Sequence, residues 1–555
     1  MTGNAPPVPS RTHEVVNQPP PLAPYDAFAT DRVLAAGLVR EGAGWAKDRA
    51  VRIGTIAGGD AVEWGRLANE HPPVLRTHDR YGHRIDEVEF HPAWHDLMRA
   101  SVGHELHALP WRDPRPGAHV ARAALFYMMS QAEAGHGCPI SMTYSVVPAM
   151  RAQPEIAAEW EPRVHATAYD PRCVPPAEKS GVLCGMAMTE KQGGSDVRAN
   201  TTRARPLDRG GPGAEYEITG HKWFCSAPMC DAFLVLAHTE RGLSCFLLPR
   251  WLPDGSRNRF HLQRLKDKLG NRSNASSEVE FDGAWARMVG EEGRGVQTII
   301  EMVAHTRLDC VIGSSSGMRQ TLVQAIHHAR HRHVFGRRLL DQALMQNVLA
   351  DLCLESEAAT TAMLRLARAY DEGAHDPRAR RFARLATAAL KYWVCKRYPP
   401  FAAEALECLG GSGYVEESAM PRLFRESPLN SIWEGSGNVI CLDVLRAMAR
   451  EPESFDAVMA EIAPAEQAEP RLRAWMGRLR ADLVEAATVE VRARTIVERL
   501  AIALQAAQLV RAAPPFVADA FCASRLVEGG HGLAFGTLPA GLPLDQIIER
   551  HAPVA

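Results

Sequence analysis

The chain has 555 residues, of which 46% are hydrophobic and 23% are charged. These are the proportions of an ordinary globular protein, and no apolar run reaches the roughly 18 residues of a membrane-spanning helix, so we expect a soluble protein without a membrane partner. The 63 lysines and arginines are balanced by 65 aspartates and glutamates, so any nucleic-acid-binding surface has to be local.

The first half of the chain changes character twice. Residues 1–25 contain seven prolines, which predicts an extended N-terminal arm. From 26 to 180 the apolar positions recur at helical spacing, which predicts an N-terminal helical domain. Between 181 and 290 short apolar segments alternate with Gly, Pro, Asp and Asn, which predicts a small antiparallel β-domain in the middle of the chain.

Helical spacing returns in the second half. Long helical stretches are predicted over 295–373 and 378–408 and a shorter one over 437–450, which together make a helical domain from 291 to 450. Residues 451–555 are again helical in pattern and contain ten arginines but no lysine, so we expect an added C-terminal domain. The fold class is therefore α+β and mostly helical.

The cysteine spacing and the N-terminal residues indicate in which cellular compartment the protein works. The twelve cysteines show no C-x-x-C spacing, and the N-terminal residues lack the basic and apolar segments of a secretory signal. We therefore expect reduced thiols and a cytoplasmic protein.

Three segments carry residues suited to chemistry. In 186–197 two adjacent glycines let the backbone approach a ligand, and Thr189 and Ser195 supply hydroxyls. In 220–228 Phe224 and Ser226 lie two positions apart, on one side of an extended chain. In 430–439 a glutamate, Glu434, is flanked by a tryptophan and small residues, where desolvation raises a carboxyl pKa toward values useful for proton abstraction. Taken singly, they also fit a glycine turn, a core aromatic and a solvated loop glutamate.

Together the three segments resemble the acyl-CoA dehydrogenase family over roughly residues 80–450. The resemblance implies a helical domain, a middle β-domain and a four-helix domain, with FAD as cofactor. A further family element, R-x-Q-F-G, whose arginine reaches the FAD of a neighbouring subunit, is present as residues 332–336 with Val334 in place of the glutamine. The implied FAD contacts are Met186, Met188, Thr189, Gly193, Gly194, Ser195, Phe224, Cys225, Ser226, Arg332, Phe335, Ile432, Trp433, Gly435, Ser436 and Asn438.

The resemblance also implies a reaction and an assembly. In the family a glutamate, here Glu434, removes the α-proton of an acyl thioester while the β-hydride passes to the flavin. Donors to the thioester carbonyl strengthen as enolate charge develops, and in the family one of them is the backbone N–H of that glutamate. The family's FAD site is completed by a neighbouring subunit, which implies a homotetramer built as a dimer of dimers.

One branch of the family matches more closely, from about residue 14 to past 520. The matching strings include 40–45, 65–69, 90–94, 265–274 and 431–438. They are similar to the flavoproteins of the adaptive response to DNA alkylation, which implies a protective role and binding of double-stranded DNA. The alternative is a metabolic acyl-CoA dehydrogenase that acts on a short or branched acyl-CoA and has no DNA role.

The sequence supports DNA binding only in part. Residues 451–555 carry fourteen acidic residues against ten arginines, yet within 471–511 eight arginines meet only four acidic residues. Arginines flank an apolar stripe on a predicted helix there, which fits either a phosphate-binding surface or a core helix with salt-bridged margins. The DNA-contact candidates are Arg446, Arg471, Arg473, Arg478 and Arg480.

A histidine-rich string at 327–333 places His327 and His331 four residues apart on a helix. No third ligand is suggested and the string directly precedes the FAD-contact element, so we predict a solvated helix face and no metal site.

Overall fold

The structure is a computed structural model that describes residues 12–484, 486–527 and 534–553. The first eleven residues of the predicted arm therefore lie outside the described residues. From residue 12 to residue 25 the arm contains neither helix nor strand and is bound to the second half of the chain. Asn17 exchanges hydrogen bonds with the backbone of His333, and His327 Nε2 lies 2.7 Å from the carbonyl oxygen of Pro20.

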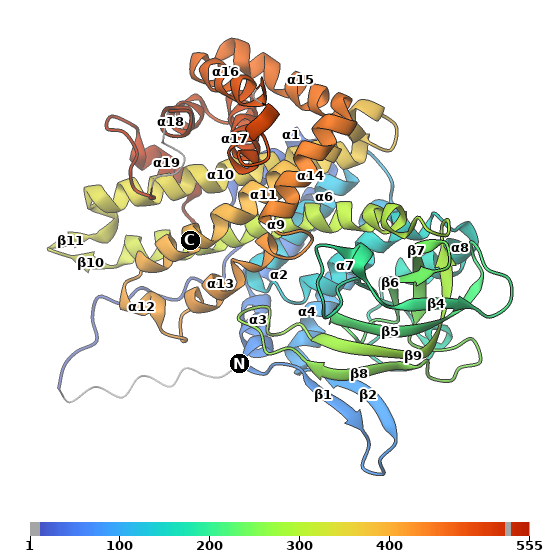
Figure 1. The fold of residues 1–555 in the computed structure, drawn as a ribbon. Coiled ribbons are helices and arrows are strands. Elements are labelled where there is room, and N and C mark those ends of the chain that lie inside the picture. The colour runs from blue at the N-terminus through green and yellow to red at the C-terminus, as the bar shows by residue number, and fades with distance from the viewer. Residues whose placement is uncertain (1–11, 485, 528–533, 554–555) are drawn as a thin grey trace.

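The region after the arm is mainly helical, with one exception. Every residue of α6 (Ala118–Ala132) is buried, including Arg122, which pairs with Asp309, so α6 lies at the centre of this region. A hairpin of β1 (Val74–His78) and β2 (Arg84–Glu89), which the helical spacing did not predict, projects from it beside the β-domain (Figure 1). The helices are α1 (Arg32–Arg40), α2 (Lys47–Ala57), α3 (Asp60–Glu70), α4 (Pro92–Gly103), α5 (Leu109–Arg112), α6 (Ala118–Ala132), α7 (Gly137–Met150) and α8 (Pro154–Val164).

The middle of the chain forms one seven-stranded sheet. Its order is β3-β6-β4-β5-β9-β7, with β8 paired to β9. Most pairings are antiparallel, as predicted, but β3 and β4 each pair with β6 in parallel. The strands are β3 (Cys184–Ala187), β4 (Arg203–Pro206), β5 (Glu215–Ser226), β6 (Ala232–Thr239), β7 (Gly242–Pro249), β8 (Phe260–Leu265) and β9 (Ser276–Val289).

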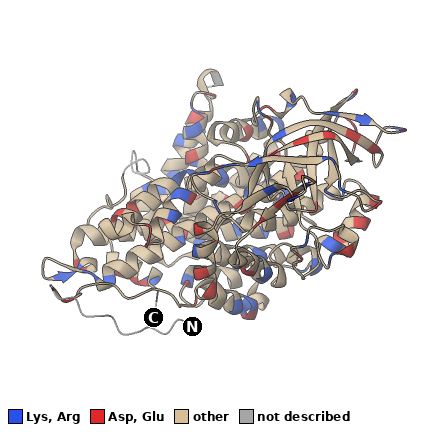
Figure 2. Ribbon diagram, turned by 90° about the horizontal axis from the view of Figure 1, so that it is seen from below, with Lys and Arg blue, Asp and Glu red and all other residues tan. Residues whose placement is uncertain are grey.

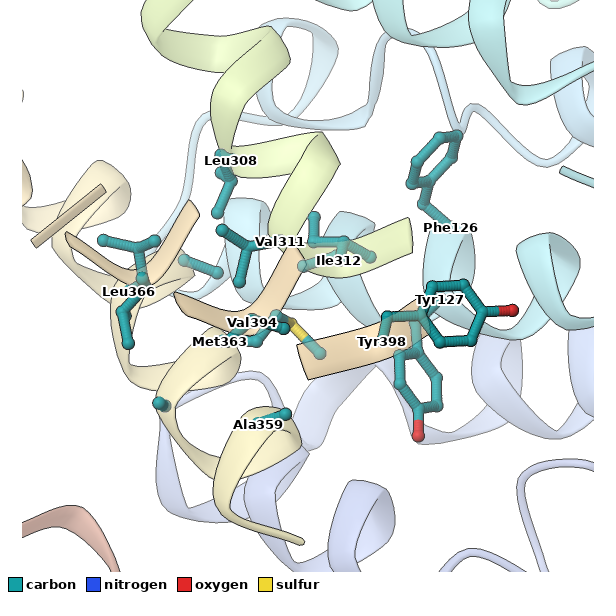
Figure 3. Packing of buried hydrophobic residues seen from close by; sticks show 14 of the residues in the cluster. Phe126, Tyr127, Leu308, Val311, Ile312, Ala359, Met363, Leu366, Val394 and Tyr398 are labelled. Carbon is teal, nitrogen blue, oxygen red and sulfur yellow. The ribbon is translucent and has the colours of Figure 1, made fainter. Parts of the chain in front are cut away.

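Long helices then cross the molecule and form its main core. Apolar side chains of α6, α9, α10 and α11 interdigitate there, among them Leu308, Met363 and Val394 (Figure 3). A tight hairpin, β10 (His333–Val334) with β11 (Arg337–Arg338), separates α9 from α10, where helical spacing alone predicts one continuous stretch. The helices are α9 (Gly295–His331), α10 (Ala343–Glu372), α11 (Pro377–Glu407), α12 (Gly411–Tyr414), α13 (Met420–Glu426) and α14 (Gly437–Arg450).

The C-terminal region packs on α10 and α11 through charged as well as apolar contacts. On α10, Asp351 pairs with Arg525, and Glu357 pairs with Arg550 at 2.9 Å and with His551 at 2.9 Å. Both carboxylates are buried. The helices of this region are α15 (Pro452–Ala468), α16 (Pro470–Val484), α17 (Ala493–Ala512), α18 (Pro515–Arg525) and α19 (Leu544–His551).

The helices bear on membrane spanning and the cysteines on the state of the thiols. Within the described ranges, none of the helices combines the length and apolar character that a bilayer crossing requires. All twelve cysteines lie in the described part of the chain and are free thiols, eleven of them buried.

Candidate functional site

The loop that follows β3 is held by a buried ion pair. The ammonium of Lys222 lies 2.7 Å from Glu190 Oε1, and neither side chain is exposed to solvent. Burial alone would raise the pKa of Glu190, but the ammonium, together with the Thr201 backbone N–H and the Thr202 hydroxyl, holds it well below its ordinary value. The loop is therefore fixed at its base while Gly193, Gly194 and Ser195 stay exposed.

A glycine is needed inside this loop. A Cβ on Gly194 would lie 2.5 Å from Thr189 Oγ1, so any side chain there would displace the threonine. The loop also lies beside the end of β5, because the Trp223 N–H donates to the Thr189 carbonyl at 2.8 Å. Two of the three segments singled out in the sequence are thus adjacent.

At the end of β5 exposed and buried side chains alternate, as the sequence predicted. Phe224 is 47% exposed and Ser226 is partly exposed, whereas the side chain between them, that of Cys225, is completely buried. The side chain of Cys225 therefore lies on the opposite face from Phe224 and Ser226, and Met186 is also buried. On the Phe224 side Cys225 presents its backbone, and the FAD contacts of Cys225 and Met186 stay predictions.

The loop that carries Glu434 is held by two cations through three successive carbonyl groups. The ammonium of Lys391, on α11, donates to the carbonyls of Trp433, at 2.8 Å, and of Gly435. Arg307 Nε, on α9, donates to the carbonyl of Glu434 at 2.9 Å. Glu434 itself has a φ of 57°, a conformation that is rare for residues other than glycine and costs about 1–3 kcal/mol. These hydrogen bonds hold Glu434 in a strained backbone conformation, which fixes the direction of its side chain.

The carboxylate of Glu434 is half-buried and has one hydroxyl donor. Thr306 Oγ1, on α9, donates to Glu434 Oε2 at 2.8 Å. Burial raises the pKa of Glu434 above its ordinary value, and the hydroxyl, Lys391 and Arg307 oppose part of that rise. The carboxylate of Glu434 therefore has a higher proton affinity than that of an exposed glutamate.

Replacing Thr306 tests this environment directly. Thr306→Val keeps the shape but removes a hydrogen bond to a charged group, worth roughly 1.5–3 kcal/mol. We expect the acid limb of any Glu434-dependent reaction to move to higher pH by about 1–2 units. The measurement is the pH profile of kcat/KM, with Thr321→Val as a control because its hydroxyl bonds only carbonyls of its own helix. An unmoved acid limb would show that Thr306 does not act on the base.

Cys138, at the start of α7, connects the β5 side to the Glu434 side. Its thiol lies near Asn274, Ser226 and Glu434, all of which act on its pKa. Burial raises the pKa of this thiol to about 11, so it stays protonated at neutral pH. Ser226 and Glu434 thus both lie near Cys138, and a single site formed by Thr189, Phe224, Ser226 and Glu434 stays a prediction.

Arg332 and Phe335 are not part of this location. They lie in the β10–β11 hairpin, at the end of the molecule away from the β-sheet (Figure 1). Thr306 and His331 lie 25 residues apart on the same straight helix, which places them about 38 Å from each other. Arg332 NH1 instead donates to the carbonyl of Asn17 at 2.6 Å, and Phe335 is 97% exposed. An FAD bound beside Glu434 of the same chain is therefore out of reach of this arginine.

Met188 lies in the loop directly after β3 and is half-buried, and the other remaining predicted contacts lie around the start of α14. Ile432 is 62% exposed, Trp433 is held by a bond from its Nε1 to Asn430 Oδ1, and Ser436 is the first residue before the helix. Asn438 Oδ1 accepts a bond of 2.8 Å from Arg494 Nε of α17, a contact from the C-terminal region that sequence reasoning missed.

These residues fit an FAD molecule. Phe224 and Ile432 expose apolar surface that a flat ring can cover, and the hydroxyls of Thr189, Ser195 and Ser226 can bond a polar ring edge or a phosphate. The exposed glycines at 193 and 194 let such a group approach the backbone. Among the described residues, no cluster of three or more His, Cys, Asp or Glu side chains could hold a metal ion.

The five arginines proposed to contact DNA are mostly engaged within the chain. Arg471 binds Glu469 and Asp519, Arg480 binds Glu466, and Arg446 lies 3.9 Å from Asp443. Arg473 and Arg478 donate to the carbonyls of Gln467 and Leu526. Basic and acidic residues are interspersed along the helices and strands (Figure 2). Counting charges along the sequence could not reveal these pairings.

Three family models match the chain, and together they span most of it. The adaptive response protein AidB N-terminal domain matches residues 17–171, the acyl-CoA dehydrogenase middle domain matches 185–284, and the acyl-CoA dehydrogenase C-terminal domain matches 293–449. The first model covers the arm and the N-terminal helices, the second the sheet, and the third the helices that carry Glu434.

Curated relatives and solved structures agree with these matches. AidB of Escherichia coli K12 is 47% identical over 515 residues, which are 92% of this chain and 94% of that protein. Acyl-CoA dehydrogenase family member 11 of Caenorhabditis elegans is 30% identical over 69% of this chain and 64% of that protein. The apo form of Bd2924 superposes with a TM-score of 0.82 at 27% identity, covering 89% of this chain and 99% of that one. The Caenorhabditis elegans ACDH-11 structure with C11-CoA gives 0.83 at 24% identity, covering 98% and 93%.

Proposed function

Because the chain belongs to the acyl-CoA dehydrogenase family and is similar to AidB over nearly its whole length, we propose that it oxidises a CoA thioester between the α and β carbons, with Glu434 as the catalytic base. Membership of that family makes it an FAD-dependent oxidoreductase. The observation that carries the proposal for Glu434 is its placement: a half-buried carboxylate on a strained loop that is held by Lys391 and Arg307.

The proposed chemistry assigns each of these groups a task. Glu434 takes the α-proton, and the raised pKa of its carboxyl favours that transfer near neutral pH. The Glu434 backbone N–H binds the thioester carbonyl, where negative charge grows as the proton leaves. Lys391 and Arg307 keep the peptides on both sides of Glu434 from rotating, so base and N–H stay aligned. FAD, when bound, supplies the acceptor for the hydride that leaves the β carbon.

Anaerobic titration of the FAD-bound protein with a panel of acyl-CoAs tests the proposal. We expect the flavin absorbance to bleach with at least one straight-chain or branched acyl-CoA. Bleaching should weaken at acid pH, because the carboxyl of Glu434 becomes protonated below its raised pKa and can no longer take the proton. A protein that binds FAD yet is bleached by none of the acyl-CoAs would contradict the proposed substrate class.

We further propose a role in the response to DNA alkylation, with binding of double-stranded DNA. The support is the match to the adaptive response AidB N-terminal domain and the 47% identity to AidB. The exposed Arg446, Arg450 and Arg473 are the best placed to meet phosphates. We expect the logarithm of duplex affinity to fall linearly with the logarithm of salt concentration, measured by fluorescence anisotropy. Affinity that does not change with salt would leave the metabolic alternative, a dehydrogenase without a DNA role.

A homotetramer in the cytoplasm completes the proposal. The Arg332 hairpin lies too far from this chain's own Glu434 to contact the same FAD, and its exposed Phe335 suits contact with another subunit. The twelve free thiols suit a reducing compartment. Equilibrium ultracentrifugation tests the assembly, and a protein that remains a monomer with FAD bound would contradict it.

A further inference from the structure

A half-buried lysine lies behind the face on which the flavin is proposed to bind. Lys268, in the loop between β8 and β9, donates to the carbonyl of Asn274 and, at 3.0 Å, to Ser276 Oγ. Ser276 Oγ lies 3.2 Å from Ser226 Oγ, the hydroxyl at the end of β5. These contacts form a continuous series of hydrogen bonds from an ammonium group to the flavin face. The reaction described above does not use this series.

The donor and acceptor chemistry of these groups fixes which way each hydrogen bond points. A lysine ammonium has three donors and no acceptor, so Ser276 must accept from it. The hydrogen of Ser276 is then available for Ser226. With Ser276 donating to its oxygen, Ser226 can direct its own hydrogen to the open side of the strand, where Phe224 is exposed.

We propose that Lys268 is a positioning residue for the flavin reaction, which orients the Ser226 hydroxyl as a donor toward the flavin ring and places a positive charge behind it. This inference rests on the proposed function, because it needs a bound flavin. A donor and a positive charge both favour the electron-rich, reduced state of the ring. Lys268 therefore raises the flavin reduction potential without touching the substrate.

The groups that surround Lys268 set the pH at which this effect ends. Cys138, at the start of α7, Glu426, on α13, and Glu133, just after α6, act on its charge, and Arg422 acts on Glu426. Burial lowers the pKa of Lys268 to about 8, which the two carboxyl groups oppose in part, and burial raises the pKa of Glu426 to about 7. The ammonium is charged below about pH 8, so the potential should fall more steeply above that pH.

The test is the reduction potential of the FAD-bound protein, measured spectrophotometrically against a reference dye at pH 6.5 and pH 9. Lys268→Met should shift the ratio of oxidised to reduced flavin about tenfold toward oxidised at pH 6.5, or roughly 30 mV for a two-electron couple. The difference from the unaltered protein should shrink at pH 9. Arg272→Met is the matched control, because it removes an exposed cation from the same loop and should leave the potential unchanged.

Ser276→Ala separates the hydrogen-bond chain from the charge. It keeps the ammonium but breaks its link to Ser226, so it should lower the potential by less than Lys268→Met. The double variant should match Lys268→Met alone, because both changes act through one chain. Strictly additive effects would overturn the proposed route through Ser276.

The outcomes distinguish this inference from the proposed function. An unaltered protein that takes up no FAD contradicts the proposed function. An unaltered protein that binds FAD with the same potential as Lys268→Met at both pH values contradicts only the role of Lys268. If Lys268→Met folds but does not retain FAD, Ser276→Ala decides, and an unchanged potential in that variant overturns the inference.

Discussion

Glu434→Gln is expected to abolish acyl-CoA oxidation while the protein keeps its fold and its flavin. The amide keeps the shape of the carboxylate and can still accept the hydrogen bond from Thr306, so the loop held by Lys391 and Arg307 should not move. What is lost is the group that takes the α-proton, and a general base contributes roughly 10²–10⁴-fold to a rate. We expect a loss of at least that size in the rate of anaerobic flavin bleaching by the best acyl-CoA.

A matched control for this variant lies on the same helix as Thr306. Glu301 is exposed on α9, just over one turn before Thr306, and Glu301→Gln removes the same charge without entering the site. Its bleaching rate should equal that of the unaltered protein. Unchanged turnover in Glu434→Gln would remove Glu434 from the role of base, whatever the flavin spectrum.

The second large effect concerns stability. Lys222→Met is expected to destabilise the protein by about 3–5 kcal/mol, because it leaves the Glu190 carboxylate buried without its counter-charge. The loss should appear as a lower midpoint of chemical denaturation. Since this pair fixes the base of the loop that carries Thr189 and Ser195, retained FAD should also fall.

Two comparisons make this result specific. Lys191 is next to Glu190 but exposed. Lys191→Met should change the free energy of unfolding by no more than about 0.5 kcal/mol. The double variant Lys222→Met with Glu190→Gln removes the uncompensated charge and should recover part of the loss. Equal midpoints for Lys222→Met and Lys191→Met would show that the buried pair contributes nothing to stability.

The order of domains and the three site segments could be predicted because they depend on local patterns. Helical spacing, short apolar strands, and the pairing of Phe224 with Ser226 on one side of a strand are all properties of neighbouring residues. The β1–β2 hairpin was missed because its strands are five and six residues long and rich in charged side chains, so they lack a clear alternation.

The groups that hold Glu434 in place could not be read from the sequence. Lys391, Arg307 and Thr306 lie between 43 and 128 positions away, and only the packing of α9 and α11 brings them to the loop. The same reason applies to the arginines of α16, whose partners Glu466 and Asp519 lie on other helices. Local charge counts indicate how many cations a segment has but not which of them are already paired.

The acidic residues of α10 have a consequence for how the chain is made. The partners of Asp351 and Glu357 come from residues 525–551, about two hundred positions later. In the folded protein both carboxylates are buried, so the ion pairs that compensate their charge form only after residues 525–551 have been synthesised.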